Sequence, residues 1–306
     1  MRTDRRSDSA EGLALGAGAY VLWGLFPLYW PLLEPASATE ILAHRVVWSL
    51  VTVTLVLLAA RRLRHARDVV RDRRRMPYVA VGGIVVALNW GTYIYAVNSG
   101  HVVESSLGYF INPLVTIAFG VVFLRERLRP VQWFALGLAA VAVVELTWEY
   151  GRVPYIALTL ALTFAVYGLM KKKAGVGSVE GLALETATVA PVAIGYLVFL
   201  AVTGASTFGS DGLGHAVLLA STGIVTAVPL LLFGAAATRL SLTALGLLQY
   251  LAPILQFAFG VLLFHEEMTT GRWLGFVLVW VALVIITVEA AHHRRSTLRA
   301  AAENVV

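Results

Sequence analysis

The sequence predicts an all-helical integral membrane protein with ten transmembrane helices, arranged as two inverted repeats of five helices. Three observations lead to this fold class. Of the 306 residues, 58% are hydrophobic and only 14% are charged, with a mean hydropathy of +0.77, whereas about a quarter of the residues in soluble domains are charged. The apolar residues gather in long runs, and one long segment occurs twice in the chain.

Each apolar run is long enough to cross a membrane. A transmembrane helix needs about 20 residues, and in hydrocarbon only helices or closed barrels satisfy the backbone. The first run is also too long for the apolar part of a signal peptide, which has about 7–15 residues. The ten predicted spans are 12–33, 39–60, 77–97, 104–124, 130–148, 153–171, 181–203, 215–237, 242–264 and 271–290.

The lysines and arginines predict the orientation, because they favour cytoplasmic loops. All but Arg45, Arg152 and Arg272 of the 24 lie in the two tails or in the loop after every second span. Both termini are therefore expected in the cytoplasm. The arginine-rich loop 61–75 is interpreted as a topology determinant that contacts membrane lipid, not as a nucleic-acid site.

Residues 107–144 and 247–284 align without a gap. They share the ordered block Pro-x4-Ala-Phe-Gly-Val-x4-Glu-x6-Trp, beginning at Pro113 and Pro253. Five spans per half place the second half in the opposite orientation, so the predicted units are a tail (1–11), two repeats (12–148 and 153–290) and a second tail (291–306). Inverted repeats are typical of transporters that work by alternating access, with the site near the midplane.

Polar and aromatic residues inside the spans are the candidates for a substrate cavity. For amides the alternative is a structural hydrogen bond between helices, and for aromatic residues it is the interfacial belt. Pro113 and Pro253 are candidate hinges, with simple packing kinks as the alternative. The cavity candidates are Tyr20, Trp23, Asn89, Trp90, Tyr93, Tyr109, Asn112, Tyr167, Gln249, Tyr250 and Gln256.

The segment EILAHR (40–45) places three polar side chains at the start of an apolar span. Glu40 and His44 are neighbours on one helix face, and a charge within the bilayer is costly unless it is partnered. Two interpretations stay open: a structural ion pair of Arg45 with Glu104 or Glu145, or a gate or charged site facing the cavity. His44 and His101 are also candidates for coupling to protons, with a hydrogen bond at the level of the lipid headgroups as the alternative. Glu185 aligns with Arg45 at the offset of the repeat, so the two are candidates for paired gates at opposite ends of the pathway.

Motifs for other chemistry are missing from the sequence. There is no G-x-x-x-x-G-K-[ST] phosphate loop, no cysteine and no metal-ligand spacing, so neither a cofactor nor a metal is expected. The competing hypothesis is an intramembrane enzyme or lipid-modifying protein that uses Glu40, His44, Glu104 and Glu145. A receptor or assembly factor is a third, disfavoured by the lack of an extramembrane domain.

Four segments of the sequence also resemble a known family of membrane proteins. LGAGAYVLWGLFPLYW (15–30), EILAHRVVWSL (40–50), LNWGTYIYAVNSGHVVESSLGYFINPL (88–114) and LGLLQYLAPILQF (245–257) resemble the drug/metabolite transporter superfamily, and more narrowly its EamA-type RarD branch. The resemblance implies a permease of the bacterial inner membrane that exports a small organic metabolite or drug and is not an enzyme. Arg45 among aromatic residues suits an anionic or zwitterionic cargo, such as an aromatic amino acid. Each chain holds both repeats, so a monomer would suffice, and a homodimer stays open.

Overall fold

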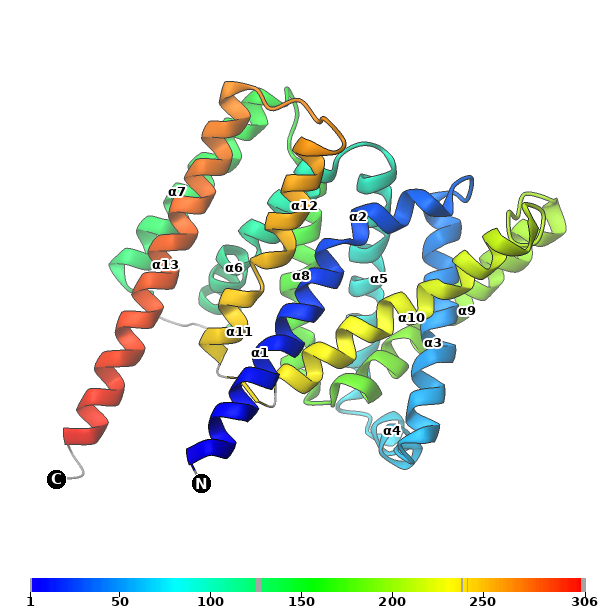
Figure 1. Ribbon diagram of the computed structural model, residues 1–306, viewed down its shortest axis with the longest axis horizontal. Coiled ribbons are helices and arrows are strands. Elements are labelled where there is room, and N and C mark those ends of the chain that lie inside the picture. The colour runs from blue at the N-terminus through cyan, green and yellow to red at the C-terminus, as the bar shows by residue number, and fades with distance from the viewer. Residues whose placement is uncertain (1, 125–127, 238, 241, 304–306) are drawn as a thin grey trace.

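The computed structural model describes residues 2–124, 128–237, 239–240 and 242–303, and within them every regular element is a helix. The all-helical class is therefore confirmed (Figure 1). The elements are α1 (Arg2–Gly24), α2 (Phe26–Tyr29), the 3-10 helix η1 (Trp30–Leu33), α3 (Ala38–Ala59), α4 (Leu63–Arg71), α5 (Met76–Asn98), α6 (Val102–Leu124), α7 (Pro130–Glu149), α8 (Tyr155–Ala174), α9 (Ser178–Thr203), α10 (Gly212–Ala237), α11 (Leu242–Leu248), α12 (Leu251–Leu262) and α13 (Thr270–Glu303).

Eight of the helices described are long and apolar enough to cross a membrane, namely α3, α5 to α10 and α13. A ninth span is formed if α1 and the segment Phe26–Leu33, which meet at a bend of 43°, count as one. α12 has 12 residues and is only about 18 Å long, so it reaches the length of a span only together with α11. The chain is thus a multi-pass membrane protein, while the ninth predicted span, over 242–264, and with it the total of ten, stays a prediction.

The surface of the bundle is as apolar as a lipid environment requires. Trp148, Val202 and Leu213 are each more than 80% exposed, whereas Arg45, Glu104 and Gln256 are buried. Exposed apolar residues and buried polar ones are expected where the hydrocarbon of the bilayer replaces water around the protein. Polar side chains that are costly in lipid are directed instead toward the interior of the bundle.

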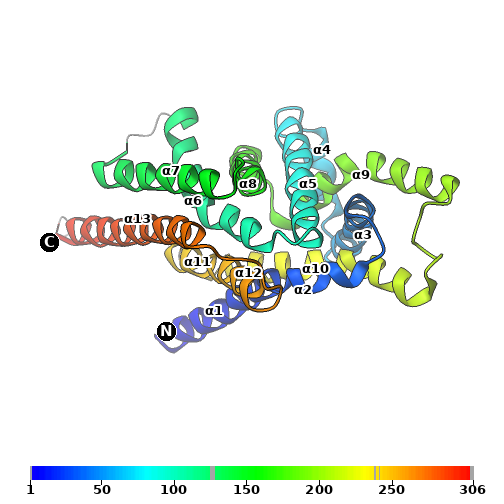
Figure 2. The same cartoon turned by 90° about the horizontal axis from the view of Figure 1, so that it is seen from above.

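The helices before residue 150 interleave with those after it. The most extensive helix–helix contacts pair α7 with α13, α3 with α9 and α10, α5 and α6 with α8, and α1 with α10. Both views place α7 beside α13 at one edge of the molecule (Figures 1 and 2). The two halves of the chain therefore share one interior, and residues from both can meet in it.

Three glycines allow the closest crossings between the halves. Gly83 of α5 lies against the backbone of α9, Gly108 of α6 against that of α8, and Gly223 of α10 against that of α3. A Cβ atom at any of these positions would lie less than 3.0 Å from a backbone oxygen of the neighbouring helix. Small residues at such crossings allow membrane helices to approach closely.

The two termini and α4 lie at one end of the bundle, which we call the near face (Figure 1). The links α5–α6, α7–α8, α9–α10 and α12–α13 lie at the opposite end, which we call the distal face (Figure 1).

Candidate functional site

Arg45 is a buried cation, only 3% exposed, about 10 Å along α3 from its first residue. Three aromatic rings surround its guanidinium group. The Cζ atom lies 4.1 Å from the ring centre of Trp90, 4.9 Å from that of Trp30 and 5.6 Å from that of Phe26. Such cation–π contacts contribute about 0.5–2 kcal/mol each. We call this group, together with Thr226, the arginine cage.

The cage leaves most of the hydrogen-bonding capacity of Arg45 unused. Its Nε donates to Oγ1 of Thr226 at 3.0 Å, from α10 in the second half. Within the described part of the chain this is the single hydrogen bond of a group with five N–H donors, and none of the ion pairs there includes Arg45. The positive charge therefore has no acidic partner among the described residues.

Among the residues described here Arg45 forms no ion pair with Glu104 or Glu145, so the predicted structural ion pair is wrong there. Glu104 binds Nη2 of Arg152 at 2.7 Å and accepts a hydrogen bond from the backbone N of Ile156 at 3.1 Å. Glu145 lies half-buried on α7, whose main partner is α13. Arg152 lies in the α7–α8 link and Ile156 at the start of α8, so both partners of Glu104 come from one short stretch of chain.

Glu40 and His44 both contact the α9–α10 link, whereas Glu104 is bound at the α7–α8 link. Glu40 accepts hydrogen bonds from the backbone N of Thr207 at 2.8 Å and from Ser206 at 3.2 Å, which ties the start of α3 to the α9–α10 link. The ring of His44 stacks on Phe208 with 4.8 Å between ring centres, and both of its nitrogens are buried without a hydrogen-bond partner among the described residues. The acidic residues and His44 therefore do not converge on one catalytic cluster.

The polar residues of α5 and α6 meet as the sequence predicts, but mainly to join helices. Asn89 donates to the carbonyl of Leu160 at 3.0 Å and to Thr163 at 2.9 Å, and it accepts a longer bond from the Tyr109 hydroxyl at 3.4 Å. The ring of Tyr93 packs edge-on against Tyr109 at 5.6 Å. Both tyrosines, with Tyr29, lie near enough to Arg45 to interact electrostatically. They thus extend the arginine cage toward α8.

The remaining cavity candidates lie in other places. Tyr20 and Trp23 form an aromatic cluster with Phe233, and Gln256 donates to the carbonyl of Trp23 at 3.1 Å. Asn112 bonds Thr116 within α6. Gln249 and Tyr250 lie at the break between α11 and α12, and Tyr250 lines an apolar cavity beside α13. Of the predicted set, Trp90, Tyr93 and Tyr109 therefore lie near Arg45, and Asn89 is joined to them through the hydroxyl of Tyr109.

Glu185 and Tyr167 form a second polar cluster, toward the near face. The Tyr167 hydroxyl donates to Glu185 at 2.9 Å, and Nζ of Lys171 lies 3.1 Å from the other carboxylate oxygen. Glu185 is thus paired within its own half of the chain, and its role as a gate stays a prediction. Of the two candidate hinges, Pro113 lies inside the continuous helix α6, while Pro253 lies in the first turn of α12, just after the break.

Glu266, the glutamate of the repeated block in the second half, was not among the predicted site residues. Its carboxylate accepts the backbone N–H groups of Val102 at 2.5 Å and Val103 at 3.0 Å, at the start of α6. Burial raises the pKa of Glu266, although the two N–H groups and Arg272 act to lower it. Like Glu40 and Glu104, it binds backbone N–H groups of the opposite half at the distal face. The signal available in the sequence was its match to Glu126, which lies outside the described residues.

Phe26, Trp30 and Thr226 were also missed as cage residues. Phe26 and Trp30 are four residues apart and so lie on one face of a helical segment, which is the signal that could have paired them. Thr226 is 181 residues from Arg45, and nothing in the local sequence links the two.

Comparisons with known proteins agree with this architecture. Residues 10–148 and 153–288 each match the EamA-like transporter family. Protein RarD of Streptomyces exfoliatus is 55% identical, with 98% of this chain and 96% of the relative covered. Protein RarD of Escherichia coli K12 is 40% identical, with 94% and 97% covered. A solved crystal structure with 20% sequence identity covers 92% of this chain and 98% of its own, at a TM-score of 0.57, and shares the fold. The chain therefore belongs to the EamA-like transporter family and groups with proteins named RarD.

Proposed function

We propose that the protein is a secondary active transporter that moves a small organic metabolite or drug by alternating access. The two halves would be inverted repeats of five spans, with α1, α2 and η1 as the first span and α11 with α12 as the ninth. The separate family matches of the two halves support a duplication, and their interleaved packing supports a binding site between them. In this arrangement the near face lies toward the cytoplasm of the bacterial cell and the transporter works as an exporter, the direction implied by the resemblance.

The arginine cage is the observation that carries the proposal. A buried cation with one hydrogen bond is costly, and a substrate anion would supply the missing acceptors. A carboxylate suits the planar guanidinium because it accepts two parallel N–H bonds. The rings of Trp30, Trp90 and Phe26 favour a cargo with an apolar or aromatic part beside that carboxylate. Amino acids and related amphipathic solutes satisfy both requirements.

The test is efflux from proteoliposomes loaded with a mixed pool of amino acids, sugar phosphates, nucleosides and chloramphenicol, with and without a pH gradient. Loss of each compound is compared between the native protein, Arg45→Gln and Arg64→Gln. Arg64 lies exposed on α4, so its variant controls for a general loss of positive charge.

We expect selective loss of a carboxylate-bearing compound, unchanged in Arg64→Gln and reduced at least tenfold in Arg45→Gln, since a hydrogen bond to a charged group contributes about 1.5–3 kcal/mol. Dependence on the gradient would identify proton coupling. Transport that survives Arg45→Gln with the same selectivity would contradict the assigned role of the cage.

A further inference from the structure

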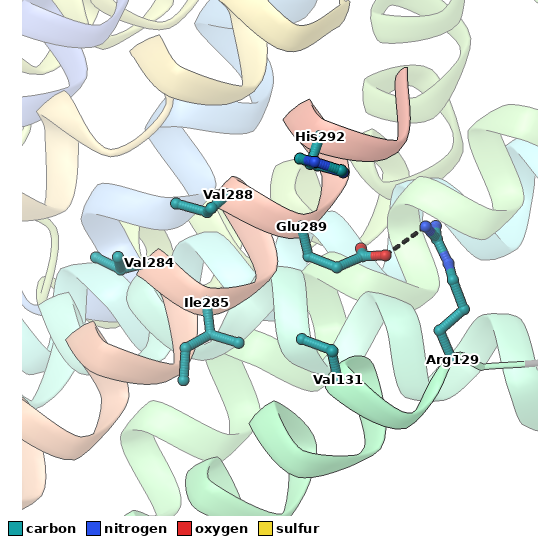
Figure 3. Close-up of a pocket in the computed structure, with 7 residues that line it drawn as sticks. All are labelled: Arg129, Val131, Val284, Ile285, Val288, Glu289 and His292. Atoms are coloured by element: carbon teal, nitrogen blue, oxygen red, sulfur yellow. Dashed lines mark ion pairs between the residues drawn. The ribbon is translucent and has the colours of Figure 1, made fainter. Parts of the chain in front are cut away.

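Two cavities adjoin on α13 and form one groove on the side of the bundle. The first, of about 560 Å³, lies between α13 and the start of α7 (Figure 3). The second, of about 540 Å³, lies between α13, α12 and α6 and is lined by apolar side chains apart from Tyr250 and Thr287. Val284 and Val288 line both cavities. Together they follow α13 from Trp280 to His292, a length of roughly 18 Å at the helical rise of 1.5 Å per residue.

The end of this groove carries opposite charges side by side. Arg129 at the start of α7 forms an ion pair with Glu289 of α13, and His292 lies one turn further on (Figure 3). The Arg129 side chain is 42% exposed, whereas that of Glu289 is only 12% exposed. One carboxylate oxygen of Glu289 is bound by Arg129, and the other is buried without a hydrogen-bond partner among the residues described.

A buried carboxylate oxygen without a donor is unfavourable, so the groove is incomplete as it stands. An apolar channel of this length, open to the side of a membrane helix, suits an acyl chain. Its charged end adds two requirements. A ligand there must bring an N–H donor for Glu289 and a negative group for Arg129, close to each other on the headgroup.

We propose that this groove is a binding site for a glycerophospholipid with a primary ammonium headgroup. One acyl chain lies along Val284 and Val288, the phosphate faces Arg129, and the ammonium donates to Glu289. A trimethylammonium headgroup has no N–H to donate, and a headgroup of net negative charge meets Glu289 with repulsion. The site does not depend on the proposed transport function, because its occupancy is measured on the resting protein.

The test uses quenching of tryptophan fluorescence by brominated acyl chains. Trp280 lines the groove, and subtracting the signal of Trp280→Phe isolates its share among the eight tryptophans. The purified protein in detergent micelles is titrated with brominated phosphatidylethanolamine, phosphatidylcholine or phosphatidylglycerol. Glu289→Gln tests the headgroup contact. Glu11→Gln is the matched control, because Glu11 also forms an ion pair with an arginine of the other half, Arg239, at a different place.

In the native protein and in Glu11→Gln, we expect phosphatidylethanolamine to quench Trp280 at a several-fold lower mole fraction than the other two lipids. In Glu289→Gln the advantage over phosphatidylcholine is lost. Equal quenching by all three lipids in the native protein, or strongest quenching by phosphatidylglycerol, overturns the proposal. If Glu289→Gln does not fold, Val284→Phe is the second variant, because it narrows the groove at an exposed position. Quenching that stays selective for phosphatidylethanolamine in Val284→Phe overturns the assigned location.

Discussion

The guanidinium carbon of Arg45 lies 4.1 Å from the ring centre of Trp90, the closest of its three aromatic contacts. The two residues come from α3 and α5 of the first half, while the hydrogen bond to Thr226 reaches into the second. The indole face stabilises the cation without neutralising it, since it offers a quadrupole and not a negative charge. Trp90 therefore holds Arg45 inside the bundle with its charge still available.

Replacing Trp90 tests this arrangement. We expect Trp90→Leu to raise the KM for the transported compound about 2- to 30-fold, in line with a cation–π contribution of about 0.5–2 kcal/mol. Trp90→Phe keeps a weaker ring face, so its KM should lie between that of the native protein and that of Trp90→Leu. Transport in proteoliposomes measures the effect, with thermal unfolding as the check on folding. Identical KM values for the leucine and phenylalanine variants would argue that Trp90 acts only by volume.

Breaking the pair between Arg152 and Glu104 should lower the stability of the folded protein. In Arg152→Gln the Glu104 carboxylate stays buried and keeps only the backbone N–H of Ile156. We expect a loss of about 1–3 kcal/mol in the free energy of unfolding. The double variant Arg152→Gln/Glu104→Gln should lose less than the summed losses of the two single variants. Unfolding in detergent by urea measures each variant. Strictly additive losses would show that the two side chains do not couple.

The crossing of α5 and α9 should not tolerate a methyl group. In Gly83→Ala the added Cβ meets the backbone of Glu185, so we expect a destabilisation of about 1–3 kcal/mol. Gly137→Ala is the matched control, because a Cβ there meets nothing within 4 Å and alanine favours a helix by up to about 1 kcal/mol. Thermal unfolding of the two variants compares them directly. A Gly83→Ala protein as stable as Gly137→Ala would contradict the backbone contact.

Glu266 should give stability a specific pH dependence. Burial raises the pKa of this carboxyl above its ordinary 4.5, so the folded protein holds the proton more tightly than the unfolded chain. The stability it contributes is full below the ordinary pKa and is lost as the pH rises through the raised value. Melting curves from about pH 4 to pH 7 should therefore show the native protein losing stability relative to Glu266→Gln. A difference between the two that is constant with pH would exclude this titration.

The sequence predicts the helices of this fold well because hydrocarbon imposes a simple condition on each span. It predicts less about where a span is interrupted. Pro27 and Pro253 directly follow the bend at Leu25 and the break at Gln249–Tyr250, but Pro113 lies inside the continuous helix α6, so a proline alone does not predict a break. The residues around Arg45 were also only partly predictable from the sequence. Trp90 was among the candidates for its aromatic character. Thr226 is the partner of Arg45, and Arg152 that of Glu104, only through tertiary packing, which the local periodicity of the sequence does not predict.

The glycine crossings also set how the two halves can move. At Gly83, Gly108 and Gly223 one backbone lies directly against another, and a backbone, unlike a side chain, cannot change rotamer to make room. In the proposed transport cycle these three contacts would therefore act as the pivots between the halves. They pair α5 with α9, α6 with α8 and α10 with α3. The contact of Gly223 with Trp48 lies three residues along each helix from the hydrogen bond between Thr226 and Arg45, so a turn about it would reorient that bond and the charge that it holds.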